Sequence, residues 1–229
     1  LFDHANVPNL INYVAVRAIN MDSDDVRKNL YMYRDTRGNG EWSILPWDKD
    51  WTYGIEGDGG TFLHHPFFGD RSYAKQNANQ YSVLWTVLFG DGPTREMYLR
   101  RLRTLMDQYL QPPGTPAADG WFERRVDQWS ATVSNALPGT AGAVATLRAW
   151  FPTRRADLFV TYATTNATQV ATNRLIPGPQ PINVAVSIGN VEVSPASGNQ
   201  AEEYICLTNR LPVAVDISDW RLEGAVQYR

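Results

Sequence analysis

Apolar residues recur at helical spacing over much of the first 165 residues of the chain. Between residues 7 and 20, a period of 3.6 residues accounts for the apolar stripe formed by Val7, Leu10, Ile11, Val14, Ala15 and Ala18. Pro8 suits the first helical turn, and Asn6 stands where a capping side chain is expected. Similar patterns predict further helices over residues 81–89, 94–110, 121–136 and 141–162.

Two short strand-like runs, residues 29–34 and 41–46, interrupt the helical pattern. The segment between them, residues 35–40, is rich in Asp, Asn and Gly, so together the three segments predict a β-hairpin. An acidic loop, residues 20–25, precedes the hairpin. Residues 54–77 combine Gly, His and aromatic residues without a clear period, which predicts a long ordered loop.

The period changes from 3.6 to 2 beyond a Pro-rich segment at residues 173–183. Apolar residues then alternate at Val184, Val186 and Ile188, and again at Val213, Val215 and Ile217. We therefore expect an α+β protein with a mainly helical domain over residues 1–172, a linker over 173–183 and a β-rich module over 184–229.

Composition narrows the functional classes. The 229 residues carry 21 basic and 24 acidic side chains, and this balance does not favour a nucleic-acid partner. The lone cysteine, Cys206, excludes a disulfide scaffold or a thiolate zinc site and is expected to be a small buried residue. No apolar run approaches the roughly 20 residues of a membrane span.

The segment from residue 20 to residue 54 holds the best candidates for chemistry. Asp24 and Asn29 stand five positions apart after a helix, and Asp48 and Asp50 follow the second strand of the hairpin, with Gly54 permitting a sharp exit. Phosphoryl transfer from ATP needs a carboxylate to orient the acceptor hydroxyl, and another carboxylate with an amide oxygen to hold Mg²⁺. Ordinary protein kinases use the same five-residue interval. A solvated loop or helix cap is the alternative interpretation of such an acidic cluster.

Other reactive or charged residues have simpler expected roles. His64 and His65 are adjacent, so they would point in opposite directions and are expected to contact substrate or pack on aromatic rings. A solvated helical face is expected for Arg100, Arg101 and Arg103, with contact to an acidic substrate or a phosphate as the alternative. Core positions are expected for Trp85, Trp121, Trp129 and Trp150.

The runs at residues 28–35 and 40–54 resemble the CotH kinase family, which is named for spore coat protein H. The resemblance rests on Lys28-Asn29-Leu-Tyr31 and on Pro46-Trp47-Asp48-Lys-Asp50. It continues through His65-Pro66-Phe67 and residues 95–102 and 150–155. It implies a secreted or envelope-associated atypical kinase that uses ATP with Mg²⁺ or Mn²⁺ to phosphorylate proteins.

The resemblance also assigns roles by position. Asp24 or Asp22 would be the catalytic carboxylate, Asn29 the neighbouring metal ligand and Asp48 the main metal-binding carboxylate. Asp50 would hold the loop or a second ion, and Lys28 would neutralise phosphate charge. The ATP-binding lobe of the family would precede residue 1, so residues 1–172 are expected to be a truncated, kinase-like C-lobe with little activity alone.

The tail resembles the start of a lamin tail domain, in residues 188–209 and 215–222. This resemblance implies an incomplete immunoglobulin-like β-sandwich that attaches the protein to an envelope or surface partner. Two functions are therefore open. One is an atypical kinase acting on Ser or Thr of secreted, coat or envelope proteins, and the other is a non-catalytic bacterial surface protein with a degenerate kinase-like scaffold.

Overall fold

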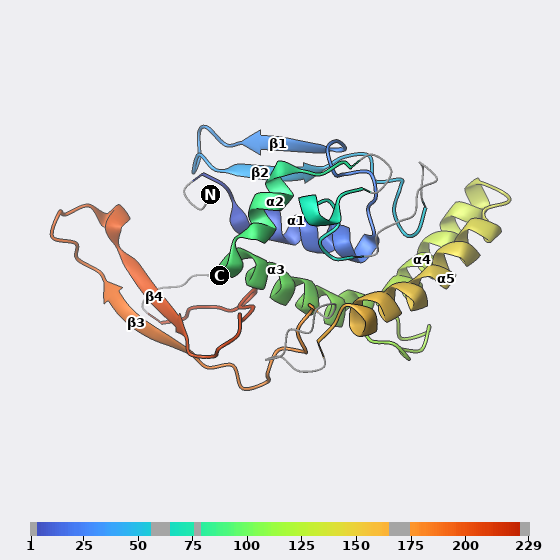
Figure 1. Ribbon diagram of the computed structural model, residues 1–229. Helices are drawn as coiled ribbons and strands as arrows, with labels where there is room; N and C mark the ends of the chain where they lie inside the picture. Colours follow the sequence, from blue (N-terminus) through green and yellow to red (C-terminus); the bar gives the residue numbers. More distant parts are fainter. Residues whose placement is uncertain (1–3, 56–64, 76–78, 165–174, 225–229) are drawn as a thin grey trace. The chain divides into compact units, whose positions relative to one another are not determined.

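The computed structural model describes residues 4–55, 65–75, 79–164 and 175–224. It divides the chain into two compact units, Leu1–Pro179 and Gln180–Arg229. The first unit contains the longer helices and one hairpin, and the second contains another small sheet (Figure 1). The protein is thus mixed helix and antiparallel sheet, as the apolar periods predict.

Helix α1 (Val7–Asn20) is the central element of the first unit. It begins where the side-chain oxygen of Asn6 accepts a hydrogen bond from the Asn9 N–H at 2.9 Å, which confirms the predicted cap. It ends at Met21, whose φ of 55° is left-handed. The predicted apolar stripe is buried, and α1 packs on both α3 (Gly92–Leu105) and β2 (Trp42–Pro46) (Figure 1).

The predicted hairpin is present. Strand β1 (Leu30–Arg34) pairs antiparallel with β2, in a register that places Leu30 opposite Pro46 and Arg34 opposite Trp42. Ile44 is buried against α1, and the backbone N–H of Ile44 donates to the side-chain oxygen of Asn9 at 2.7 Å. The hairpin is therefore fastened to the helix that precedes it.

Helices α2 (Val83–Gly90) and α3 supply further core residues of the first unit. Helix α2 contributes Trp85, Leu88 and Phe89, and α3 contributes Tyr98 and Leu102. Helices α4 (Trp121–Ala136) and α5 (Ala141–Ala156) pack against each other. Short turns also occur: π-helical at η2 (Met106–Leu110) and η3 (Asp157–Thr161), and 3₁₀ at η1 (Arg71–Tyr73).

Two expectations for the helical part are wrong. Trp129 is 61% exposed on α4, whereas Trp85 is fully buried as predicted. Arg100 is 2% exposed rather than solvated, because it donates to the Gly178 carbonyl at 2.9 Å. Arg103 likewise donates to the Pro177 carbonyl at 3.0 Å. Backbone carbonyls of a later segment therefore take these guanidinium groups out of solvent.

The second unit contains strands β3 (Val186–Glu192) and β4 (Tyr204–Asn209), paired antiparallel with an irregularity between Ile188 and Val191. It also contains the short 3₁₀ turn η4 (Gln200–Glu202). Among the described residues this is the unit's only sheet. Cys206 is exposed on β4, which corrects the expectation of burial, because two strands alone leave the position open.

The alternating apolar run at residues 213–217 does not form a strand, contrary to prediction. The side chain of Gln180 takes the place of a strand partner there. It accepts from the Asp216 N–H at 2.7 Å and donates to the Asp216 carbonyl at 3.0 Å. Among the described residues, no helix has the length and apolar character needed to cross a membrane.

Candidate functional site

The acidic loop after α1 and the segment after β2 lie side by side, although more than twenty residues separate them in sequence. Three backbone hydrogen bonds join them. Asn29 accepts from the Trp47 N–H at 3.2 Å, the Ser23 N–H donates to Trp51 at 3.2 Å, and the Tyr53 N–H donates to Asn20 at 2.7 Å. The hairpin between them therefore brings both predicted groups of carboxylates to one place.

Gly54 ends the second segment as the sequence predicts. Its φ is +82°, and an added Cβ would lie 2.4 Å from a ring carbon of Trp150. The position therefore requires glycine both for its backbone conformation and for the close approach of α5.

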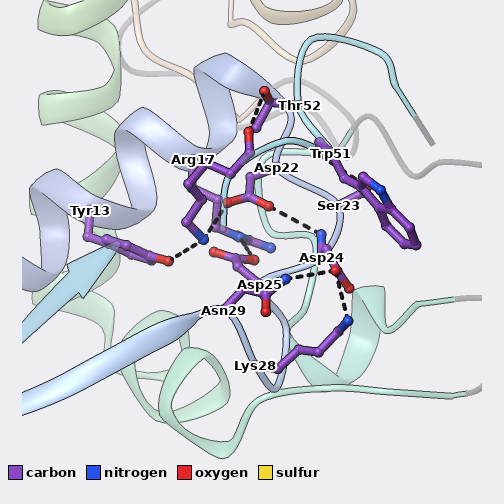
Figure 2. Close-up of polar contacts among 11 residues, drawn as sticks. Tyr13, Arg17, Asp22, Ser23, Asp24, Asp25, Lys28, Asn29, Trp51 and Thr52 are labelled. Atoms are coloured by element: carbon purple, nitrogen blue, oxygen red, sulfur yellow. Dashed lines mark hydrogen bonds and ion pairs between the residues drawn. The ribbon is translucent and has the colours of Figure 1, made fainter. Parts of the chain in front are cut away.

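Asp24 lies at the centre of this arrangement, with only 8% of its surface exposed. Its Oδ2 atom accepts a hydrogen bond from the Asn29 side-chain amide at 2.7 Å and lies 2.9 Å from the Lys28 ammonium (Figure 2). Asp24 and Asn29, which are five positions apart in sequence, are thus in direct contact. Lys28 itself is largely exposed, which leaves its ammonium accessible to a ligand.

Asp22, the alternative catalytic candidate, is bound differently. Its Oδ1 atom accepts a hydrogen bond from the backbone N–H of Asp24 at 3.2 Å, and its Oδ2 atom lies 2.7 Å from the Lys49 ammonium. Both oxygens of Asp22 are therefore used within the protein, and the residue is 5% exposed. Asp22 shapes the loop that presents Asp24.

Asp48 and Asp50 are exposed on either side of Lys49 in sequence. The pKa of Lys28 is raised mainly by its hydrogen bond with Asp24 and by the charge of Asp24, and further by the charges of Asp48 and Asp50. All three carboxylates therefore act electrostatically on one ammonium. The candidate residues of the two segments are therefore close enough to interact electrostatically through Lys28.

Two of the predicted donor positions have an unusual backbone. Asn29 has a φ of 61° and Asp48 a φ of 52°, both in the left-handed region. This conformation costs residues other than glycine about 1–2 kcal/mol, less for Asn and Asp, and such strained residues cluster at functional sites. Hydrogen bonds of its side chain and its carbonyl hold Asn29 in a conformation that an isolated chain rarely adopts.

The donor chemistry fits a hard divalent cation. Asp24 and Asp48 offer carboxylate oxygens and Asn29 an amide oxygen, which are the ligands that Mg²⁺ and Mn²⁺ prefer. Among the described residues, His, Cys, Asp and Glu form no group of three or more suited to a metal ion. One or two carboxylates suffice for Mg²⁺ when substrate phosphates complete its shell. The residues therefore fit a cation that arrives with phosphate better than an all-protein cage.

Sequence reasoning missed a buried ion pair beneath the loop. Asp25 is fully buried, and its Oδ1 atom lies 2.5 Å from Nε of Arg17, which is stacked near Phe68 and Trp85. Burial raises the pKa of Asp25 to about 6, although the charge of Arg17 acts in the opposite direction. The signal was available, because Arg17 belongs to the buried face of α1 and a buried cation needs a partner.

An aromatic surface borders the carboxylates on the outer face of the hairpin. Tyr31 is 54% exposed and Trp47 57% exposed, and their rings meet edge-on with centroids 5.4 Å apart. Tyr33 and Leu45 are exposed on the same two strands. Trp47 immediately precedes Asp48, so this apolar surface adjoins the candidate cation ligands.

Of the two predicted histidines, His64 lies outside the described residues. His65 packs on aromatic rings, which confirms one of its two expected roles. Its ring is stacked on that of Tyr73 with centroids 3.7 Å apart, and it lies edge-on to the ring of Tyr162 with centroids 4.9 Å apart. Burial lowers the pKa of His65 to about 4. His65 is thus a neutral packing residue at physiological pH.

Comparison with known proteins places most of the chain in a family. The model of a family described as CotH kinase protein matches residues 2–172. No curated protein and no solved structure gives a significant match. The family match covers the acidic loop, the hairpin and all the candidate residues described above.

Proposed function

The chain belongs to the CotH kinase protein family, and we propose that it carries the metal- and phosphate-handling residues of a kinase that transfers the γ-phosphate of ATP to Ser or Thr. The observation that carries this proposal is the convergence of Asp24, Asn29 and the Asp48–Asp50 segment through the backbone hydrogen bonds between the two segments. Positioning and charge neutralisation account for most of the catalysis of phosphoryl transfer.

Each residue has a proposed role. Asp24 orients the acceptor hydroxyl and accepts its proton, while Asn29 and Asp48 hold Mg²⁺ or Mn²⁺ and Asp50 supports the loop or a second ion. The bound cation neutralises phosphate charge and orients the phosphates. Lys28 is a further cation for the phosphates, because it is exposed and already faces the carboxylates.

The contacts of the two candidate bases favour Asp24 over Asp22. Both oxygens of Asp22 bind groups of the protein, one of them the ammonium of the partly buried Lys49. The partners of Asp24 are Asn29, itself a proposed ligand, and the exposed Lys28. A substrate that draws Lys28 toward its phosphates would free the Asp24 carboxylate for a hydroxyl, whereas Asp22 has no such exchangeable partner.

The exposed Tyr31–Trp47 pair supports the nucleotide part of the proposal. Aromatic side chains stack on nucleobases with a contribution of about 1–3 kcal/mol per base. The pair is more than half exposed and adjoins Asp48 in sequence. A nucleotide whose phosphates meet the cation ligands would therefore find an apolar platform for its base nearby.

Two finer parts of the proposal rest on resemblance alone. We propose secreted, coat or envelope proteins as substrates, with the protein itself secreted or envelope-bound, as the CotH resemblance implies. We also propose that the second unit binds an envelope or surface partner, as the resemblance to a lamin tail domain implies.

The test is phosphate transfer in the whole protein that carries this sequence, with Mn²⁺ and radiolabelled ATP and a mixture of Ser- and Thr-containing proteins. Asp24→Asn is expected to lower transfer by about 10²–10⁴-fold, because it removes the proton acceptor. Nucleotide binding is expected to remain, because the proposed cation ligands Asn29 and Asp48 and the phosphate-facing Lys28 are all retained. Asp35→Asn is the matched control, since Asp35 only accepts backbone N–H groups within the hairpin turn.

Transfer that survives unchanged in Asp24→Asn would contradict the assigned base. A folded wild-type protein that neither binds ATP nor transfers phosphate would favour the alternative class, a non-catalytic surface protein on a kinase-like scaffold.

A further inference from the structure

We infer that Lys49 is a positioning residue, whose ammonium fastens the Asp48–Asp50 segment to the acidic loop and so fixes the two flanking carboxylates relative to Asp24. This inference rests on the proposed function, which supplies the role of those carboxylates. Lys49 lies between Asp48 and Asp50 in sequence but is not itself a proposed ligand.

The three consecutive residues differ in exposure and in partners. Asp48 and Asp50 are exposed, whereas the Lys49 side chain is 27% exposed. The ammonium of Lys49 is thus more buried than the carboxylates on either side. Lys49 therefore reaches inward while its neighbours remain available to a cation.

The inward contacts of Lys49 join three separate parts of the fold. Its Nζ atom lies 2.7 Å from Oδ2 of Asp22 in the acidic loop and donates to the Tyr13 hydroxyl of α1 at 2.9 Å. The Lys49 carbonyl in turn accepts a hydrogen bond from the Thr52 hydroxyl at 3.0 Å. One side chain thus ties the segment after β2 to both the helix and the loop.

The chain of contacts continues to the proposed base. The other oxygen of Asp22 accepts the backbone N–H of Asp24 at 3.2 Å. A displacement of Lys49 would therefore loosen Asp22, and Asp22 shapes the backbone that presents Asp24. Lys49 acts on both sides of the site at once, through its own backbone on Asp48 and through Asp22 on Asp24.

Packing alone does not hold Lys49 in place. A cavity of about 420 Å³ runs beside it between α1 and β2, and Asn9, Tyr13, Asp22 and Thr52 are among its lining residues. A side chain that borders such a hollow lacks the tight neighbours that fix a core residue. The ion pair and the hydrogen bond must therefore supply the restraint.

Electrostatics gives this inference a test with opposite outcomes. If Lys49 were only a nearby positive charge, its removal would strengthen Mn²⁺ binding, because like charges repel. If Lys49 positions the ligands, its removal weakens Mn²⁺ binding despite the gain in negative potential. The sign of the change therefore separates the two roles.

The experiment is calorimetric titration of Mn²⁺ into the chain and its variants. We expect Lys49→Met to bind Mn²⁺ about tenfold or more weakly, corresponding to about 1.4 kcal/mol, and Lys49→Arg to stay within about threefold of wild type. Lys28→Met is the matched control, because it removes an exposed cation from Asp24 and is expected to bind Mn²⁺ more tightly. Equal or tighter binding by Lys49→Met would overturn the inference.

A second measurement needs no metal. Amide hydrogen exchange of Ser23 and Tyr53, whose N–H groups bridge the two segments, is expected to quicken about tenfold in Lys49→Met and not in Lys49→Arg. If wild type binds Mn²⁺ neither alone nor together with ATP, the proposed function fails, and the exchange rates still decide whether Lys49 holds the two segments together. Unchanged exchange rates of these two amides in Lys49→Met would refute the positioning role of Lys49. If Lys49→Met does not fold, Lys49→Gln replaces it in both measurements.

Discussion

Each aspartate of the acidic loop is distinguished by the cationic side chain with which it pairs. Asp22, Asp24 and Asp25 are nearly consecutive, yet they pair with Lys49, Lys28 and Arg17 respectively. The sequence identifies an acidic cluster but cannot rank its members, because each partner comes from a different position in the fold. The exposure of the partner then separates the roles: Arg17 and Lys49 are held inside, whereas Lys28 is accessible.

His65 provides a residue-scale prediction about pH. Its folded pKa is lowered to about 4, below the ordinary value near 6.5, so the unfolded chain binds the proton first as pH falls. The stability associated with neutral His65 is therefore complete above about pH 6.5 and is lost progressively toward pH 4. We expect the free energy of unfolding of wild type to fall more steeply over this window than that of His65→Gln, in urea titrations at several pH values.

The difference in free energy of unfolding between wild type and His65→Gln isolates the contribution of the histidine. The contribution of Asp25 to stability changes with pH in the opposite direction. Because its pKa is raised in the folded state, the folded protein binds the proton more tightly than the unfolded chain, and the free energy of unfolding falls as pH rises from about 4 to about 6. That contribution is common to both proteins and cancels in the comparison. Parallel profiles would contradict the assignment of a buried, neutral His65.

At the scale of elements, helices α4 and α5 show how a buried ion pair joins two surfaces. Arg155 meets Glu123 through two hydrogen bonds of 2.5 and 2.9 Å, and its Nε atom donates to the Leu110 carbonyl at 2.7 Å. Both side chains are 4% exposed. The same two helices carry a second pair, Arg148 with Asp127, whose side chains are 39% and 46% exposed.

These two pairs make a matched comparison. Arg155→Met is expected to lower the free energy of unfolding by about 3–5 kcal/mol, because it leaves Glu123 charged and buried without a partner. Arg148→Met is expected to change it by less than about 1 kcal/mol, since water solvates the remaining Asp127. Chemical denaturation of both variants checks this, and similar losses in the two would contradict it.

The elements also show where sequence reasoning succeeds and where it stops. The α1 stripe, its Asn6 cap and the hairpin were predictable because local period and turn chemistry determine them. The burial of Arg100 was not predictable, because its partner is a carbonyl of residue 178 on a distant segment. Residues 213–217 show the same limit, since a glutamine side chain rather than a strand binds their backbone.

At the scale of the whole molecule, the family match extends over residues 2–172, and the candidate site lies within the first third of that span. The sequence placed the candidate residues on the correct loops, because helix, hairpin and carboxylate spacing are local features. It did not reveal Lys49 or Arg17 as supports of the site, because their contacts depend on how α1 lies against the segment after β2. The loops that carry the candidate residues were thus more predictable than the contacts that hold those residues.

The cation site that we propose consists of Asn29 and Asp48, next to the proposed base Asp24. Its most direct test is calorimetric titration of Mn²⁺ into wild type and into Asp48→Asn, with Asp35→Asn as control. We expect saturable binding of Mn²⁺ in wild type and control, and a loss of affinity of at least about tenfold, or about 1.4 kcal/mol, in Asp48→Asn. Equal Mn²⁺ affinity in wild type and a folded Asp48→Asn variant would contradict it.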